Sequence, residues 1–141
     1  MLFPMTTSQF LKGFVATLIL FLAGDIVWHN FVMRDFYMQR ILAINGPDVA
    51  MGDFPPFILA FEIIASAGMS YFVLRTSKTL MEGALNGAFL GLVVVAGINF
   101  VAHSLIPKWD VPMVLVDTAW GVVLGAVAGK VIMLVAGRRK A

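Results

Sequence analysis

The chain has 141 residues, of which 60% are hydrophobic and only 13% are charged, with a formal net charge of +2. Soluble domains usually carry about 25% charged residues, so this composition excludes a water-soluble protein and predicts an integral membrane protein whose surface faces lipid. Cysteine is absent, which excludes disulfides, thiolate metal sites, iron–sulfur clusters and covalently attached c-type haem.

Four apolar stretches predict an all-α fold, an integral membrane four-helix bundle, because a helix needs about 20 apolar residues to cross a bilayer. We expect a single transmembrane domain over residues 1–141, with helices near residues 11–33, 56–75, 84–106 and 112–135. Pro55 and Pro56 open the second helix, where the missing N–H of proline costs nothing. Pro107 and Pro112 bracket a short turn, so the last two helices are expected to form an antiparallel hairpin.

The long connection after the first span, about residues 34–55, mixes apolar and polar side chains over residues 35–42. This mixture predicts a short helix that lies in the membrane interface. The alternative is that the segment is only a tether between two spans.

The distribution of Lys and Arg predicts that both termini are cytoplasmic, because cytoplasmic loops carry an excess of basic residues. With the N-terminus inside, the inner side holds seven basic residues: Lys12, Arg75, Lys78, Lys130, Arg138, Arg139 and Lys140. The outer side holds three, namely Arg34, Arg40 and Lys108. The net charge therefore reflects topology, and it does not indicate a nucleic-acid partner.

Each span carries one polar residue of a type that is costly in lipid: Asp25, Glu62, Asn99 and Asp117. At about 1.5 Å of rise per residue, all four fall about 8–12 Å below the outer boundary. Ionisable groups near the bilayer centre cost about 2.5–3.5 kcal/mol each on insertion scales, so the three carboxyls are expected to face one another or water. At least one of them should hold a proton near neutral pH, or a cation should lie among them. This polar layer is the candidate binding site, and purely structural packing is the alternative.

Two histidines stand near this layer. Asp25 and His29 are four residues apart, as are Asn99 and His103, so each pair shares a helix face. Carboxylate and imidazole groups can bind zinc, copper or iron, which makes the histidines weak candidates for a metal site of unknown occupancy. No Glu-x-x-His motif supports a di-iron bundle. The alternative is that both histidines meet water or lipid headgroups at the interface.

Glycine recurs every fourth residue in the last two spans, at Gly83, Gly87, Gly91, Gly121, Gly125 and Gly129. Small residues at this spacing let two helix backbones approach closely, so we expect a glycine zipper that packs the inner half tightly. Such a bundle would be closed toward the cytoplasm and potentially open outward. Asp117 lies four residues before Gly121, so it continues the line of glycines on the fourth span. On the second span, Ser66 lies four residues after Glu62 and is a candidate supporting residue for it. Alternatively, Ser66 bonds the backbone of its own helix.

An Asp-x-x-Trp motif occurs twice, as Asp25 to Trp28 and as Asp117 to Trp120. Residues three apart share a helix face, so each carboxylate has an indole beside it whose N–H can donate a hydrogen bond. Interfacial aromatic belts are the alternative for Trp28, but Trp120 lies too deep for that explanation.

These motifs give the chain a family resemblance. Asp25-x-x-Trp28, the pair Phe36-Tyr37 and the run Val116 to Gly121 resemble the bacterial membrane-protein family named domain of unknown function 2177. The resemblance spans nearly the whole chain and implies four helices in the bacterial inner membrane, with both termini cytoplasmic. It implies no activity. Members often show a Tyr-Asp-Leu-Thr-Asn-like run in the third helix, where this chain has Ile98 to Ala102 and thus an amide, Asn99, in place of a carboxylate.

Three functions remain open. The first is a protein that handles protons, ions or small solutes at the polar layer, completed by dimerisation. The second is an accessory or assembly subunit of a larger membrane complex, in which aromatic and Met side chains pack partner helices or lipid-like cofactors. The third is a metal-binding membrane protein or enzyme. No nucleophile–base pair or cofactor fingerprint supports a named reaction, so no catalytic residue and no cofactor is assigned.

Overall fold

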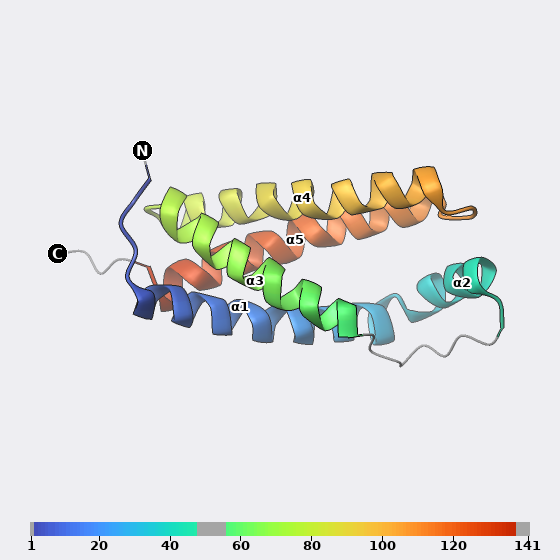
Figure 1. Cartoon of the computed structure of the whole chain (residues 1–141), viewed down its shortest axis with the longest axis horizontal. Coiled ribbons are helices and arrows are strands. Elements are labelled where there is room, and N and C mark those ends of the chain that lie inside the picture. Colours follow the sequence, from blue (N-terminus) through green and yellow to red (C-terminus); the bar gives the residue numbers. More distant parts are fainter. Residues whose placement is uncertain (1, 48–55, 138–141) are drawn as a thin grey trace.

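The computed structural model describes residues 2–47 and 56–137, and these residues form helices and no strand. The elements are α1 (Thr7–Val27), a π-helical turn (Trp28–Val32), α2 (Arg34–Asn45), α3 (Pro56–Thr76), α4 (Leu80–Leu105) and α5 (Val111–Val135). Figure 1 shows the four long helices side by side, with α2 as a short fifth helix at one end. The predicted all-α bundle is therefore confirmed.

Four helices are long and apolar enough to cross a membrane: Thr7–Val32, Pro56–Thr76, Leu80–Leu105 and Val111–Val135. Two of them begin earlier than the hydrophobic pattern predicts, because polar side chains cap them. Thr6 and Gln9 form a reciprocal capping box at the start of α1. Thr79 accepts a hydrogen bond from the backbone N–H of Glu82 at the start of α4.

The hairpin of α4 and α5 is the closest helix pair in the molecule. A methyl group added at Gly87 would lie 2.1 Å from the carbonyl oxygen of Gly125, and one added at Gly129 would lie 1.9 Å from that of Gly83. Both distances are far below van der Waals contact, so only glycine permits this approach. The two backbones therefore pack directly on each other.

The short helix expected after the first span is present as α2. It lies at the same end of the bundle as the turn between α4 and α5, whereas α1 begins and α5 ends at the opposite end (Figure 1). Arg40 Nε donates to Asp110 Oδ1 over 2.9 Å, and Lys108 Nζ donates to the carbonyl oxygen of Ala43 over 2.8 Å. These contacts attach α2 to the start of α5 and to the turn before it.

The ion pair between Arg40 and Asp110 predicts a small pH dependence of stability. Burial slightly favours the neutral carboxyl, but the hydrogen bonds from Arg40 and from the backbone N–H of Met113 lower the pKa of Asp110 below its ordinary value. A lowered folded-state pKa contributes stability above the unfolded pKa of about 3.9, and this contribution is lost as pH falls through the folded value.

We therefore expect Arg40→Ala to cost about 1 kcal/mol or less at pH 7, as for other exposed pairs. The difference from the wild type should shrink as the pH is lowered to about 2, because both proteins then carry a neutral Asp110. Detergent-induced unfolding of both proteins at several pH values measures this difference in the free energy of unfolding. An equal difference at every pH would contradict the role of the pair.

Several residues used in the sequence predictions lie outside the described residues. They are Pro55 at the start of the second span and the basic residues Arg138, Arg139 and Lys140.

Candidate functional site

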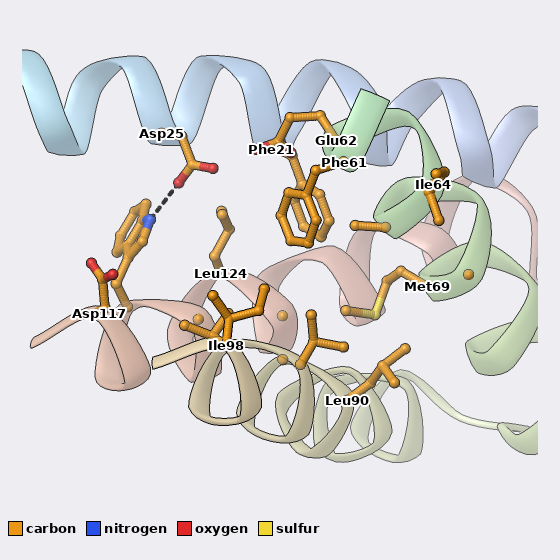
Figure 2. A pocket seen from close by; sticks show the side chains of 18 of the residues that line it. Phe21, Asp25, Phe61, Glu62, Ile64, Met69, Leu90, Ile98, Asp117 and Leu124 are labelled. Carbon is orange, nitrogen blue, oxygen red and sulfur yellow. Dashed lines mark hydrogen bonds between the residues drawn. The ribbon is translucent and has the colours of Figure 1, made fainter. Parts of the chain in front are cut away.

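A cavity of about 680 Å³ lies among the four long helices, all of which contribute to its lining. All four residues of the predicted polar layer line it, one from each long helix: Asp25, Glu62, Asn99 and Asp117. Figure 2 shows Asp25 and Asp117 toward one side of the cavity and the apolar side chains of Met69 and Leu90 toward the other. The cavity therefore has a polar end and an apolar end.

Asp25 and Glu62 meet at the polar end. The indole Nε1 of Trp120 donates to Asp25 Oδ1 over 2.6 Å (Figure 2). Glu62 is only 4% exposed, and its side chain lines the same cavity as Asp25. Two carboxyl groups in one cavity offer several acceptor oxygens and negative charge, so this pair is suited to binding a proton or another cation.

His29 lies between the two aspartates. Its Nδ1 is 2.9 Å from the backbone carbonyl oxygen of Asp25, and because a carbonyl only accepts, Nδ1 carries the hydrogen. Its Nε2 is 3.9 Å from Asp117 Oδ1, and Nδ1 is 4.0 Å from Asp25 Oδ1. Asp25, His29 and Asp117 thus form a series of titratable groups, and Glu62 lines the same cavity.

Tyr37 completes the cluster from α2, and the sequence analysis did not include it in the site. Its side chain is 2% exposed, its hydroxyl donates to Asp117 Oδ1, and it accepts from Trp28 Nε1 over 3.2 Å. Burial, and then the hydrogen bond to Asp117, raise the pKa of the Tyr37 hydroxyl. It therefore remains a hydrogen-bond donor at neutral pH. The available sequence signal was the pair Phe36-Tyr37 just after the first span.

Asn99 supports Asp117 from α4. Its Nδ2 donates to the carbonyl oxygen of Val95 over 3.0 Å and to Asp117 Oδ2 over 3.4 Å, and its Oδ1 accepts from Trp109 Nε1 over 3.0 Å. The amide thus donates to a carboxylate at a position where a second carboxylate would repel it. An amide at this position therefore keeps the negative charge of the cluster lower than a carboxylate would.

The two tryptophans of the repeated motif exchange partners between helices. Trp120 of α5 donates to Asp25 of α1, and Trp28 of α1 donates to Tyr37, so neither indole bonds the aspartate of its own motif. Their rings stack with centroids 4.5 Å apart and an interplanar angle of 1°. The expectation that each indole serves its neighbouring carboxylate is wrong, because the stacked rings reach across the α1–α5 interface.

Ser66 and His103 lie apart from the cluster. Ser66 is fully buried, but it does not line the cavity and its hydroxyl has no hydrogen-bond partner in the described part of the chain. His103 is near the turn after α4, with Nδ1 2.5 Å from the carbonyl oxygen of Trp109. Among the described residues, no group of three His, Asp or Glu side chains is arranged to hold a metal ion.

The apolar part of the cavity is a cleft between α3 and α4. At one end of these helices, Asn86 Nδ2 donates to the carbonyl oxygen of Thr76 and to the hydroxyl of Ser77, which holds α4 to the end of α3. From there α3 crosses toward α1 and away from α4 (Figure 1), and it packs more extensively on α1. The cleft therefore opens sideways, in the direction that lipid occupies around a membrane protein.

The chain matches a known family of membrane proteins. Residues 10–134 match the family described as "Predicted membrane protein (DUF2177)". No curated protein and no solved structure is similar enough to match.

Proposed function

Because this chain belongs to the DUF2177 family of predicted membrane proteins, whose description names no activity, we propose its function from the cavity. The protein handles protons, ions or small solutes, and its polar layer binds a cationic or hydrogen-bond-donating group. The observation that carries this proposal is that Asp25, Glu62, Asn99 and Asp117 all line one cavity.

The charge balance of the cavity supports binding over a purely structural role. Its lining contains three carboxyl groups, and His29 is the sole basic side chain among the described lining residues. A structural cluster of this kind is expected to pair its charges, because an unpaired charge buried in a low dielectric is costly. A bound cation or proton would supply the missing positive charge.

The tight α4–α5 hairpin favours binding over free passage. Three successive glycine contacts on each helix leave no space between these backbones away from the polar layer. A solute that reached the carboxyls could continue between α4 and α5 only if these two helices separated. Transport by that route would require a second conformation of the bundle.

Binding of propylammonium, a short water-soluble amine, tests this function. In phosphatidylcholine nanodiscs we expect it to raise the unfolding temperature of the wild type, because a ligand of the folded state stabilises that state. Glu62→Gln should remove this shift while the variant remains folded, and Glu82→Gln, at the exposed start of α4, is the matched control. A shift that is equal in the wild type and Glu62→Gln, or absent from both, would contradict the proposal.

A second candidate function is an accessory or assembly subunit of a larger membrane complex. It is favoured by Phe57, which is 87% exposed at the start of α3 beside the cleft. Native mass spectrometry of the protein gently extracted from its own membrane separates the candidates. Copurifying larger subunits would support the accessory function, whereas a chain alone or in identical copies would favour the solute-handling function.

We further propose that both termini face the cytoplasm of a bacterial inner membrane. The support is the excess of Lys and Arg on the side of the termini. A fluorescent protein fused after Ala141 should therefore be fluorescent, and alkaline phosphatase fused at the same place should be inactive. The opposite pair of results would reverse the orientation.

A further inference from the structure

The shape of the cavity suggests a class of ligand more specific than a cation. We propose that the protein binds a lipophilic amine, which enters sideways from the bilayer between α3 and α4 and places its ammonium group among Asp25, Glu62 and Asp117. This inference rests on the proposed function, because it requires the polar layer to be a binding site.

The polar end of the cavity selects the headgroup. Trp120 occupies one oxygen of Asp25, which leaves the other oxygen and the carboxyl of Glu62, in the same cavity, as acceptors. An ammonium group carries three N–H donors and a positive charge, so it matches two adjacent carboxyls. No Lys or Arg is among the described lining residues. A phosphate or carboxylate headgroup would therefore meet three carboxyls, with His29 as the sole basic side chain among the described lining residues to offset them.

The apolar end selects a hydrocarbon chain. From Glu62 to Phe72, both of which line the cavity, α3 rises about 15 Å, a length that suits a chain of about a dozen carbons. The volume of about 680 Å³ falls within the range of about 300–1,000 Å³ that is typical of small-molecule sites. A short hydrophilic cation would leave this part of the cavity without apolar contacts.

The open side of the cleft provides the route. Phe57, Ile64 and Ile98 line the cavity and also expose large parts of their side chains. In a membrane span these apolar groups face acyl chains, so a chain dissolved in the bilayer reaches the cleft without crossing water. The carboxyls at the polar end of the cavity then bind the amine in preference to uncharged hydrocarbon chains.

Two glycines give a matched pair of variants. Gly68 on α3 lines the cavity, and a methyl group added there would meet nothing within 4 Å. Gly97 on α4 has equally open space but does not line the cavity. Gly68→Leu should therefore fill the cleft without straining the fold, and Gly97→Leu should add the same side chain outside this cavity, in a second and shallower hollow of the surface.

The experiment measures saturable binding of radiolabelled dodecylamine to the protein in phosphatidylcholine nanodiscs, with empty nanodiscs subtracted for partition into lipid. We expect Gly68→Leu and Glu62→Gln each to raise the Kd at least tenfold, and Gly97→Leu to leave it unchanged. Labelled dodecanol, which has the same chain and no charge, should show no saturable binding.

Other results would overturn the inference in distinguishable ways. If propylammonium stabilises the protein through Glu62 but dodecylamine binds no more tightly and Gly68→Leu has no effect, the solute-handling function stands and the lipophilic ligand is wrong. If dodecanol binds as well as dodecylamine and Glu62→Gln has no effect, the cleft binds alkyl chains whatever their headgroup, and the proposed selection of an amine is wrong. If neither amine binds, both proposals fail.

Discussion

Replacing Gly87 by alanine is expected to destabilise the bundle by about 3 kcal/mol or more, at or beyond the upper end of the usual cost of overpacking. The added methyl group would lie 2.1 Å from the carbonyl oxygen of Gly125. Because the neighbour is backbone and cannot rotate away, α4 and α5 must move apart. Unfolding of the purified protein by increasing sodium dodecyl sulfate measures the loss.

Gly97→Ala is the matched control on the same helix. A methyl group there meets nothing within 4 Å, and alanine is the better helix former by about 1 kcal/mol. We therefore expect Gly97→Ala to be neutral or slightly stabilising. If the two variants unfold at the same detergent concentration, α4 and α5 do not pack backbone to backbone as described.

Replacing Tyr37 by alanine is expected to cost about 3–5 kcal/mol, as for other buried aromatic residues, and to release α2 from the bundle. The ring is 2% exposed and lies 4.5 Å from that of His29, centroid to centroid. The hydroxyl group also bonds Asp117 and Trp28. Limited proteolysis within α2, followed over time, measures the release, and detergent unfolding measures the free energy.

Two further variants separate the causes of this loss. Tyr37→Phe keeps the ring and removes only the hydroxyl, so it should cost about 1–3 kcal/mol, because a hydrogen-bonded group of the cluster loses its partner. Leu42→Ala changes an α2 side chain that is 38% exposed. We expect this variant to lose less than about 1 kcal/mol of the free energy of unfolding. Proteolysis of Tyr37→Ala at the rate of Leu42→Ala would show that Tyr37 does not anchor α2.

These two sites have different consequences for function. The Gly87 variant tests the part of the bundle that closes the space between α4 and α5, whereas the Tyr37 variants test the attachment of α2 to the carboxylate cluster. Asp117 receives hydrogen bonds from Tyr37 and from Asn99. Loss of Tyr37 therefore leaves the Asp117 carboxylate with one hydrogen-bond donor fewer to stabilise its charge.

Much of the fold followed from the sequence because it depends on local patterns. Hydrophobic length marks each span, since a lipid-facing helix must satisfy all of its backbone hydrogen bonds internally. Depth along a straight helix is simple arithmetic at a fixed rise, so the chain positions of Asp25, Glu62, Asn99 and Asp117 suffice to assign them to one layer. The tertiary structure brings all four to the same cavity.

Other features depended on contacts between distant segments. Tyr37 lies outside the spans, and the pair Phe36-Tyr37 does not show by itself that the Tyr37 hydroxyl lies against Asp117, 80 residues away. The exchange of tryptophan partners was equally hidden, because helical spacing shows which side chains share a face but not which neighbouring helix that face meets.

The sequence by itself determined the membrane class, the four spans and the family, and it predicted a common depth for the polar residues, because each follows from composition, motifs or the fixed geometry of one helix. Only the tertiary structure decided the partners of Trp28, Trp120 and Tyr37, and the cleft between α3 and α4. The physical reason is that crossing angles depend on the packing of many side chains at once. Here the closely packed α4–α5 glycines and the contact of α3 with α1 leave the α3–α4 side open.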